Sequence, residues 1–436
     1  MITCVFLPFA AGSYLSYLFR TINALISDHL STDIGLGTAD LGLLTSLYFL
    51  VFAAAQIPVG ILLDRFSPRR VQSALLLVAA AGAGLFAVST GLVSLLIARA
   101  MIGLGVAAAL TAGLKSIVLW FPRERVALLN GYMVMLGSFG AVTATAPAEH
   151  LLGWMGWRQL FEILAAATGA TAMLIYVVVP ERAIVPSTAS TPATLSSVFR
   201  DRRFWRMAPL SATCVGSAWS LQGLWASPWL TDVEGLDRAS VVRQLFIMSV
   251  VLSGGAWLFG TTVHYIRRRG NEAETILAIV AVMFIAAELA LVLRVPLPSI
   301  LPWSLVAIVG TATVVSFAVI ADYFPPELAG RANGALNVLH FGFAFLAQYM
   351  TGLILEHWAT GDGHKPILAY QVAFGLNVVL QIAALVRFAL PWLRYFTRWI
   401  GSSTPSMAVN VSDAPEPVHL YEQAIRPMPA DDDTEW

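Results

Sequence analysis

The sequence is poor in charge and almost without cysteine. Only 12% of its 436 residues are Asp, Glu, Lys or Arg, whereas 58% are apolar, which lies outside the usual range of soluble domains. The two cysteines, Cys4 and Cys214, give neither a disulfide framework nor a metal-ligand spacing. The composition indicates a membrane protein, and we expect no metal and no cofactor.

Motifs of soluble enzymes are also missing. There is no Gly-x-x-x-x-Gly-Lys-Ser/Thr loop for a nucleotide and no His-Glu-x-x-His zinc motif. We therefore expect neither an enzyme nor transport driven by ATP hydrolysis within this chain. The expected partners are the lipid bilayer and a small solute, and we expect no nucleic-acid partner.

Long apolar stretches make up most of the chain. A membrane-spanning helix needs roughly 20 apolar residues, and twelve such stretches are separated by short polar turns. No stretch alternates as barrel strands do, so the predicted fold class is all-α. The first run continues past Arg20 to full length, which predicts a membrane helix rather than a cleaved signal. The expected spans are 3–31, 39–63, 71–90, 92–121, 127–152, 157–179, 204–231, 240–266, 274–294, 298–323, 330–356 and 367–393.

Basic residues are concentrated in the loops of one side. The other side carries Arg158, Arg238, Arg243, Arg294 and Lys365. The positive-inside rule makes the richer side cytoplasmic and places both termini there, as an even number of spans requires. We expect a multi-pass protein of the plasma membrane, the inner membrane of a bacterium. The arginines of the richer side are Arg65, Arg69, Arg70, Arg123, Arg125, Arg182, Arg200, Arg202, Arg203, Arg267, Arg268, Arg269, Arg331, Arg394 and Arg398.

One polar sequence occurs twice. WFPRERVALLNG, from Trp120 to Gly131, matches YFPPELAGRANG, from Tyr323 to Gly334, at a displacement of 203 positions. Pro122 and Pro325 lack an amide proton, so each copy predicts the end of one span and the start of the next. Further matches at offsets near 200 predict two homologous six-helix halves. The predicted regions are a first bundle (1–179), a cytoplasmic linker (180–203), a second bundle (204–398) and a disordered cytoplasmic tail (399–436).

The turn after the second span carries the most specific motif. GILLDRFSPRR, from Gly60 to Arg70, resembles the loop 2–3 signature of the major facilitator superfamily, Gly-x-x-x-Asp-Arg-x-Gly-Arg-Arg, with Ser67-Pro68 in place of one Gly. RAMIGLG, from Arg99 to Gly105, resembles a second motif of that family. The resemblance covers about 1–398 and implies a gradient-driven secondary transporter whose halves rock about a central cavity. We expect a monomer.

The same resemblance implies a cytoplasmic latch at the loop 2–3 signature. Asp64 and the nearby arginines can exchange partners between two packings, which suits a transporter whose two states differ little in free energy. The alternative is that these arginines only set the topology. The predicted gating residues are Gly60, Asp64, Arg65, Arg69 and Arg70.

Ionisable side chains at membrane depth are costly unless they are paired or hydrated, so they are the first candidates for a binding site. Arg20 lies inside the first span, Arg99 inside the fourth, and His340 near the middle of the eleventh on one face with Asn337. Lys115 lies near the inner end of the fourth span, where it can snorkel. The alternatives are structural roles for both arginines and a core or proton-carrying role for His340.

Acidic residues, by contrast, are expected near the span ends. Asp28, Glu149 and Glu356 fall near outer ends and Asp64 and Asp322 near inner ends, with none expected in the middle of any span. Cations without a fixed anion favour an anionic substrate over a lipophilic cation.

Arg20 also resembles the first-span arginine of organic-anion symporters. In those proteins an Asp commonly precedes the arginine and helps to carry the coupling proton, whereas Phe19 stands there in this chain. The resemblance therefore leaves the coupling ion open, as a proton or another ion.

Polar and aromatic residues of the second and seventh spans complete the candidate set. Trp219, Gln222 and Trp225 follow one another at i, i+3 and i+6, which places an amide between two indoles on roughly one helix face. The alternative is that the tryptophans form an interfacial belt. Tyr48 and Gln56 are candidates of the same kind.

Together these features predict an uptake permease for a small organic anion. An exporter of drugs or metabolites is the first alternative, although the fifth span has its proline at Pro147, beyond the place expected for the Gly-Pro motif of many exporters. A membrane sensor or scaffold is the second alternative, and the short tail supplies no signalling domain for it.

Overall fold

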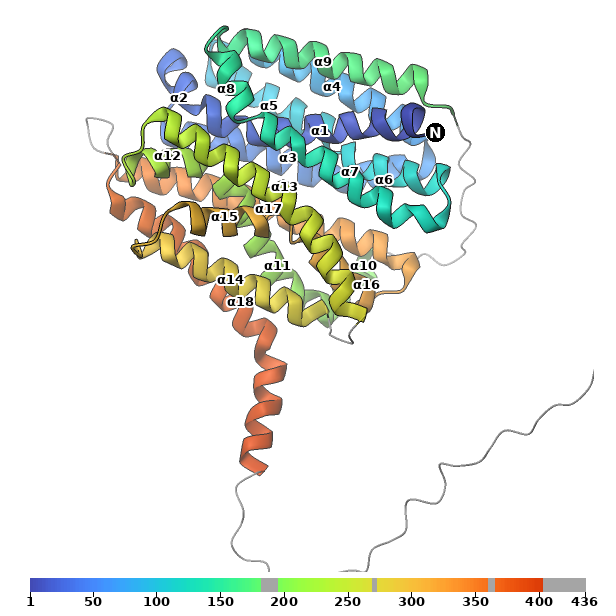
Figure 1. Cartoon of the computed structure of the whole chain (residues 1–436), viewed down its shortest axis with the longest axis vertical. Helices are drawn as coiled ribbons and strands as arrows, with labels where there is room; N and C mark the ends of the chain where they lie inside the picture. Colours follow the sequence, from blue (N-terminus) through green and yellow to red (C-terminus); the bar gives the residue numbers. More distant parts are fainter. Residues whose placement is uncertain (182–194, 269–272, 360–364, 403–436) are drawn as a thin grey trace, which may run out of the picture. The chain divides into compact units, whose positions relative to one another are not determined.

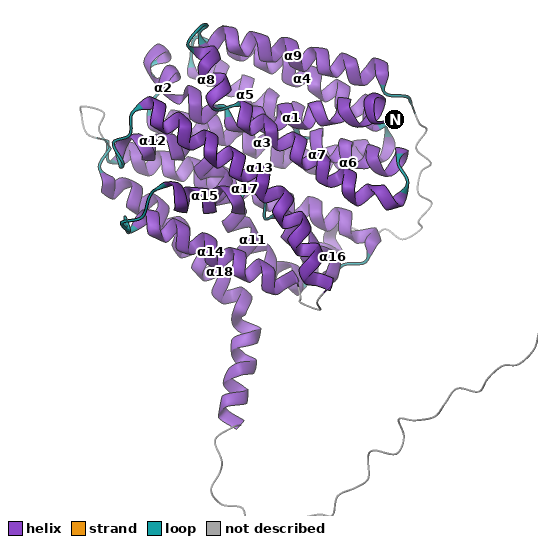
Figure 2. Cartoon of the chain, viewed as in Figure 1, coloured by secondary structure: helices purple, strands orange, loops and turns teal. Residues whose placement is uncertain are grey.

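Helices account for all regular structure in the described part of the chain. The computed structural model describes residues 1–181, 195–268, 273–359 and 365–402, and these ranges contain no strand (Figure 2). The fold class is all-α, as the sequence predicts.

The helices before the linker are η1 (Ile2–Phe6), α1 (Leu7–Thr21), α2 (Asn23–Ile34), α3 (Thr38–Arg65), α4 (Pro68–Val88), α5 (Leu92–Val106), α6 (Ala109–Trp120), α7 (Arg123–Thr143), α8 (Ala146–Leu152) and α9 (Trp157–Val178). Those after it are α10 (Leu195–Arg200), α11 (Arg202–Ser220), η2 (Leu221–Trp225), α12 (Ala226–Asp232), α13 (Arg238–Arg268), α14 (Ala273–Val292), α15 (Ile300–Val309), α16 (Thr313–Tyr323), α17 (Pro326–His357) and α18 (Ile367–Ser402). Of these, η1 and η2 are π-helical.

Ten segments of the described chain are long and apolar enough to cross a membrane. They correspond to ten of the twelve expected spans. The other two expected spans, 204–231 and 240–266, are helical as α11 to α12 and as α13, but they are not among the ten. The multi-span helical fold is confirmed, and the full count of twelve stays a prediction.

The duplicated polar sequence forms the same helix break twice. Pro122 caps the N-terminus of α7 with φ −63° and ψ 149°, and Pro325 caps that of α17 with φ −64° and ψ 158°. In each copy a missing amide proton ends the preceding helix, and the extended proline starts the next. The two breaks therefore have the same physical cause and the same backbone geometry.

Met1–Phe388 forms one compact unit, in which the helices run largely side by side (Figure 1). Helices from before and after the linker meet along two seams, α3 against α17 and α7 against α13. At the first seam the chains come so close that a Cβ on Gly42 would lie 3.2 Å from Gly352 Cα. Small residues allow this approach. The division into two bundles stays a prediction.

Two predicted boundaries differ from the structure. The predicted linker contains the short helix α10, and residues 182–194 lie outside the described residues. The predicted disordered tail begins at residue 399, whereas α18 continues to Ser402, and the tail itself stays a prediction. The remainder of the tail, 403–436, and Arg269 lie outside the described residues.

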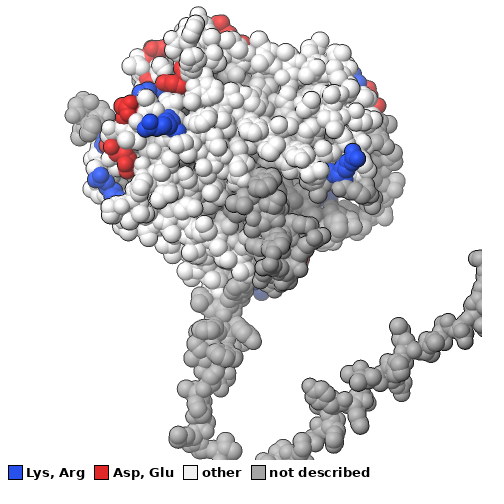
Figure 3. Space-filling view, in the orientation of Figure 1, with Lys and Arg blue, Asp and Glu red and all other residues white. Residues whose placement is uncertain are grey.

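Charge is concentrated at the ends of the helices. Figure 3 shows that most charged side chains on this face gather at the end where α2, α8 and α12 lie, and that the middle is nearly free of charge. We call this end, which carries Asp28, Glu149 and Glu356, the acidic end. The opposite end, which carries Gly60–Arg70, is called the signature end. An uncharged band between two charged ends fits a bilayer.

Candidate functional site

The guanidinium of Arg20 lies between two aromatic rings from different parts of the chain. Its Cζ is 4.3 Å from the ring centroid of Tyr17 on α1 and 5.0 Å from that of Trp219 on α11. Trp219 is itself fixed, because its Nε1 donates to Gly310 O at 2.8 Å. Within the described residues Arg20 has neither an ion pair nor a hydrogen bond, so a partly exposed cation is held by ring faces alone.

Aromatic rings continue from this point across the α3–α17 seam. Phe52 of α3 stacks on Phe341 of α17 with centroids 4.0 Å apart, and Phe341 lies 4.6 Å from Trp219. Tyr48, one turn before Phe52, is buried and lies 6.0 Å from it. The structure therefore brings together the predicted residues Arg20, Tyr48 and Trp219 on an apolar, aromatic surface.

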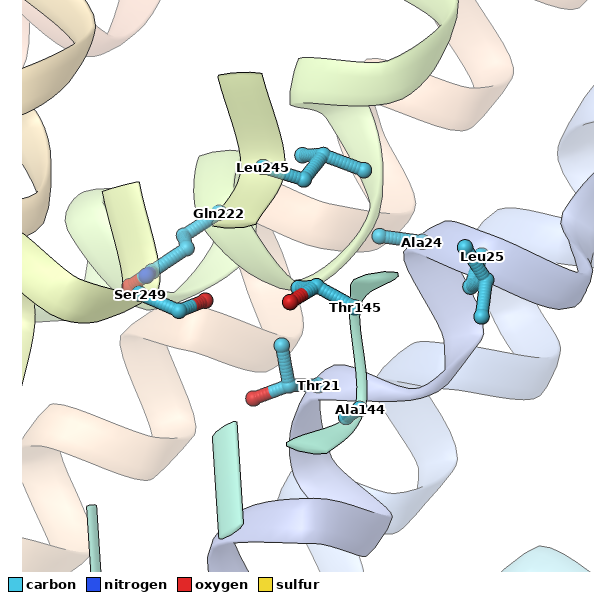
Figure 4. A pocket seen from close by; sticks show the side chains of 8 residues that line it. All are labelled: Thr21, Ala24, Leu25, Ala144, Thr145, Gln222, Leu245 and Ser249. Carbon is cyan, nitrogen blue, oxygen red and sulfur yellow. The ribbon is translucent and has the colours of Figure 1, made fainter. Parts of the chain in front are cut away.

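Thr21, the residue after Arg20, lines a small pocket together with Gln222 (Figure 4). Gln222, on the π-helix η2, faces it, and its buried Nε2 has no hydrogen-bond partner within the described part of the chain. A Cβ built on Gly223, the next residue, would lie 3.7 Å from the backbone oxygen of Arg20. A π-helical turn inside an α-helical run is often found at functional sites. The pocket is lined by Thr21, Ala24, Leu25, Ala144, Thr145, Gln222, Leu245 and Ser249.

Arg99 does not join this site. Its side chain is completely buried, its Nη1 donates to Phe19 O at 3.1 Å, and its Cζ lies 4.8 Å from the Phe86 ring and 5.7 Å from the Phe161 ring. All three partners belong to the helices before the linker. The structure supports the alternative in which Arg99 organises the helix bundle.

Trp225 and Gln56 also have protein partners. Trp225 Nε1 donates to Gln348 O at 3.2 Å, and its ring fills the α3–α17 crossing. Gln56 Nε2 donates to Phe52 O and Ala107 O, both at 3.4 Å. Both side chains are buried, so packing accounts for them in this state of the protein.

His340 lies behind the aromatic surface. Its Nε2 is 2.7 Å from Ser211 Oγ, which is 2.6 Å from Ser316 Oγ, and its ring is 5.9 Å from Trp219. The side chain is completely buried, and Nδ1 has no partner among the described residues. Asn337, one turn away, is partly exposed. The His340 ring therefore packs edge-on against Trp219, the residue whose ring also lies near Arg20.

The expectation that no acidic residue lies well inside a span is wrong. Glu288 lies within α14, one of the membrane-crossing segments, and its side chain is completely buried. Its Oε2 accepts a hydrogen bond from Gln381 Nε2 at 2.6 Å. Glu288 lies inside the expected span 274–294, so its position in the sequence is enough to contradict that expectation.

The family model described as "Major Facilitator Superfamily" matches residues 9–348. The chain belongs to the major facilitator superfamily. This family is one of transporters, so the protein is a membrane transporter rather than an enzyme.

Relatives and solved structures agree with this assignment. The Escherichia coli K12 hexuronate transporter is 22% identical over 399 residues, covering 85% of this chain and 90% of its own. The probable L-galactonate transporter of the same organism is 24% identical over 318 residues, covering 66% and 68%. The crystal structure of a bacterial homologue of the human lysosomal transporter Spinster has a TM-score of 0.71 at 18% identity and covers 88% of this chain and 95% of its own.

The loop 2–3 signature of this facilitator protein has partners within residues 1–181. Lys115 Nζ bonds Asp64 Oδ1 at 3.0 Å, and Arg70 Nε bonds Glu181 Oε1 at 2.6 Å. Arg69 Cζ lies 4.8 Å from the Tyr176 ring. Arg65 is exposed, and a Cβ on Gly60 would meet nothing within 4 Å. The predicted latch residues thus make local contacts in this state.

Among the described residues, the ion pairs and side-chain caps that join helices before the linker to helices after it lie at the acidic end rather than at the signature end. Arg238 of α13 forms a bidentate pair with Glu149 of α8, at 2.8 and 2.7 Å, and bonds Asp28 of α2 at 3.0 Å. The hydrogen bond to Glu149 raises the pKa of Arg238 above its ordinary value. Glu356 of α17 accepts the amides of Thr38 and Ala39 at the start of α3. The sequence placed these acids at span ends but did not indicate that they pair.

Proposed function

We propose that this facilitator protein is an uptake permease for a small hydroxylated organic anion. The observation that carries the proposal is the position of Arg20, a cation in the membrane interior whose described contacts are the ring faces of Tyr17 and Trp219. A carboxylate from the substrate would give this guanidinium the charge-assisted hydrogen bonds that it otherwise lacks.

The neighbouring surfaces fit the rest of such a molecule. Aromatic faces of Tyr48, Phe52 and Phe341 can cover a carbon skeleton, and the unpartnered amide of Gln222 can bond a hydroxyl group. Arg20 and these partners come from helices before and after the linker. The substrate would therefore be held between parts of the chain that move relative to each other, as alternating access requires. Hexuronate and L-galactonate, which name two relatives, are hydroxylated carboxylates of this kind.

Orientation follows from the arginine distribution. The positive-inside rule places the signature end and both termini in the cytoplasm, and the acidic end outside the plasma membrane of a bacterium. The Arg238 and Glu356 contacts then close the outer side, which is the arrangement of a carrier ready to release solute inward. One chain supplies both sides of the site, which supports a monomer.

A ligand screen tests the proposal. Thermal stability of the detergent-purified protein would be measured with D-glucuronate, D-galacturonate, hexanoate and tetraphenylphosphonium, for wild type and for Arg20→Gln. Arg243→Gln is the matched control, because it removes one exposed arginine that bonds only Ser240 among the described residues.

We expect the sugar acids to raise the melting temperature of wild type and the control but not of Arg20→Gln. Stabilisation by the lipophilic cation, or by an anion to the same extent in Arg20→Gln, would favour the exporter and return Arg20 to a structural role.

A further inference from the structure

Glu288 is a completely buried carboxyl group that the proposed binding site does not use. Gln381 Nε2 donates to its Oε2 at 2.6 Å and also to Ser217 Oγ at 3.1 Å. Glu288 Oε1 and Gln381 Oε1 are both buried without a partner among the described residues. The hydrogen bonding of the cluster is thus incomplete, with one unpartnered oxygen on each of the two side chains among the described residues.

Among the side chains that the structure describes, no positive charge is found as a partner of Glu288. The facing groups are the amides of Gln381 and Asn377 on α18 and the thiol of Cys214 on α11. Helix α15 has no ionisable side chain, and the described ionisable side chains of α13 and α16 lie toward the ends of those helices. A buried carboxylate without a cation beside it is strongly disfavoured, which favours the binding of a proton.

A short chain of contacts connects this carboxyl group with the proposed substrate site. Gln381 bridges Glu288 to Ser217, and Ser217 lies two residues before Trp219, whose ring covers Arg20. Two residues after Trp219, at Leu221, the helix changes to the π-helix η2. A change in the hydrogen bonding of Gln381 therefore acts on the part of α11 that contacts Arg20.

We propose that Glu288 is the coupling-ion site of this transporter and that the ion is a proton. This inference rests on the proposed function, because it pairs one proton with one organic anion. A hydronium ion on the outer side loses its proton to the carboxylate, leaving water, and the O–H bond of Glu288 forms. On the inner side that O–H bond breaks, and a water molecule takes up the proton.

Charge balance in the membrane interior makes the coupling obligatory. With an anion beside Arg20 and a proton on Glu288, neither site has an uncompensated charge. With both sites empty, the positive Arg20 balances the ionised Glu288. An anion without a proton, or a proton without an anion, leaves one net charge in the low-dielectric interior, and that state is disfavoured for crossing.

A proton fits the site better than a sodium ion. The amide nitrogen of Gln381 donates to both Glu288 and Ser217, so a donor occupies the space between the oxygens that a metal ion would need. No group of three or more His, Cys, Asp or Glu side chains able to hold a metal occurs among the described residues.

Proteoliposomes loaded with D-glucuronate separate coupling from binding. Exchange of labelled for unlabelled D-glucuronate needs no net proton movement, whereas accumulation from a pH gradient does. We expect Glu288→Gln to retain exchange and to lose accumulation driven by an inward proton gradient, while Glu288→Asp retains both. Glu162→Gln, an exposed acid-to-amide change on α9, is the matched control and should accumulate as wild type does.

Three results would overturn the assignment. One is pH-driven accumulation by Glu288→Gln equal to that of wild type, and another is wild-type accumulation that follows a sodium gradient and ignores the pH gradient. The third comes from infrared spectroscopy of the ligand-free protein, which needs no transported substrate. On acidification, wild type and Glu162→Gln should gain the C=O band of a buried protonated carboxyl, and Glu288→Gln should not.

If that infrared band were present in Glu288→Gln, the proton would lie elsewhere. If the band behaves as expected but wild type does not exchange D-glucuronate, the proton site stands and the proposed substrate class fails. The two proposals can therefore be distinguished.

Discussion

The carboxylate of Glu356 on α17 accepts the backbone N–H of Thr38 on α3 at 2.8 Å, across 318 residues of sequence. The N–H of the next residue, Ala39, donates to the same oxygen at 3.2 Å. These are amides of the first turn of α3, which have no acceptor within their own helix, and the positive end of the helix dipole favours an anion there. A side chain of α17 thus caps the N-terminus of α3 across the α3–α17 seam.

Neutralising this cap should open the acidic end. Hydrogen bonds to a charged group contribute about 1.5 to 3 kcal/mol, so Glu356→Gln should shift the closed and open populations by about tenfold or more. Spin labels at Thr32 and Glu234, which are exposed near the acidic end before and after the linker, would report the change in a Cys4→Ser background. A distance distribution identical to that of the unmutated protein would show that the cap does not hold this state.

The Arg238–Glu149 pair should also stabilise the closed acidic end, but less than the Glu356 cap does. Both side chains are about one-third exposed, so we expect the pair to contribute about 1 kcal/mol and to weaken with added salt. Arg238→Glu should lengthen the same label distance, and adding Glu149→Arg should partly reverse the effect because the charges are exchanged. Additive effects of the two changes would mean that the pair is not coupled.

Arg99 should contribute to stability and not to substrate binding. Arg99→Ala removes packing against two phenylalanine rings and leaves Phe19 O without its donor, which we expect to cost about 2 kcal/mol or more. The melting temperature in detergent should fall, while the affinity of the folded fraction for D-glucuronate stays as in wild type. A loss of affinity as large as that of Arg20→Gln would place Arg99 in the binding site.

Gln222 should recognise hydroxyl groups rather than charge. With a substrate hydroxyl bonded to its Nε2, Gln222→Leu would lose about one hydrogen bond, near 1 kcal/mol, and D-glucuronate affinity should fall about fivefold to tenfold. Hexanoate, a carboxylate of the same carbon number without hydroxyl groups, should bind both proteins alike. An equal loss for the two acids in isothermal titration would assign Gln222 a general role in packing.

Much of the fold could be predicted from the sequence because bilayer physics leaves few choices. Apolar length determines where helices cross, and Pro122 and Pro325 determine where two of them begin. Arg20 was found for the same reason, since an arginine inside an apolar run needs an explanation.

The contacts between distant residues could not be predicted. Arg20 meets Trp219, and Glu356 meets Thr38, only because α1, α3, α11 and α17 pack side by side, and a single sequence contains no record of which helix faces which. Lys115 bonds Asp64 of the loop 2–3 signature, a pairing that the position of Lys115 near the inner end of a span does not indicate. Glu288 was visible in the sequence, but its burial and its bond to Gln381 appear only once α14 and α18 are placed together.

The most direct test of the account is uptake of labelled D-glucuronate into proteoliposomes by wild type, Arg20→Lys, Arg20→Gln and the control Arg243→Gln. Loss of one charge-assisted contact of about 1.5 to 3 kcal/mol predicts a reduction of about tenfold to a hundredfold in kcat/KM for Arg20→Gln, with Arg20→Lys in between and the control at the wild-type level. Uptake by Arg20→Gln at the wild-type rate would contradict the assignment of Arg20 as the group that binds the substrate anion.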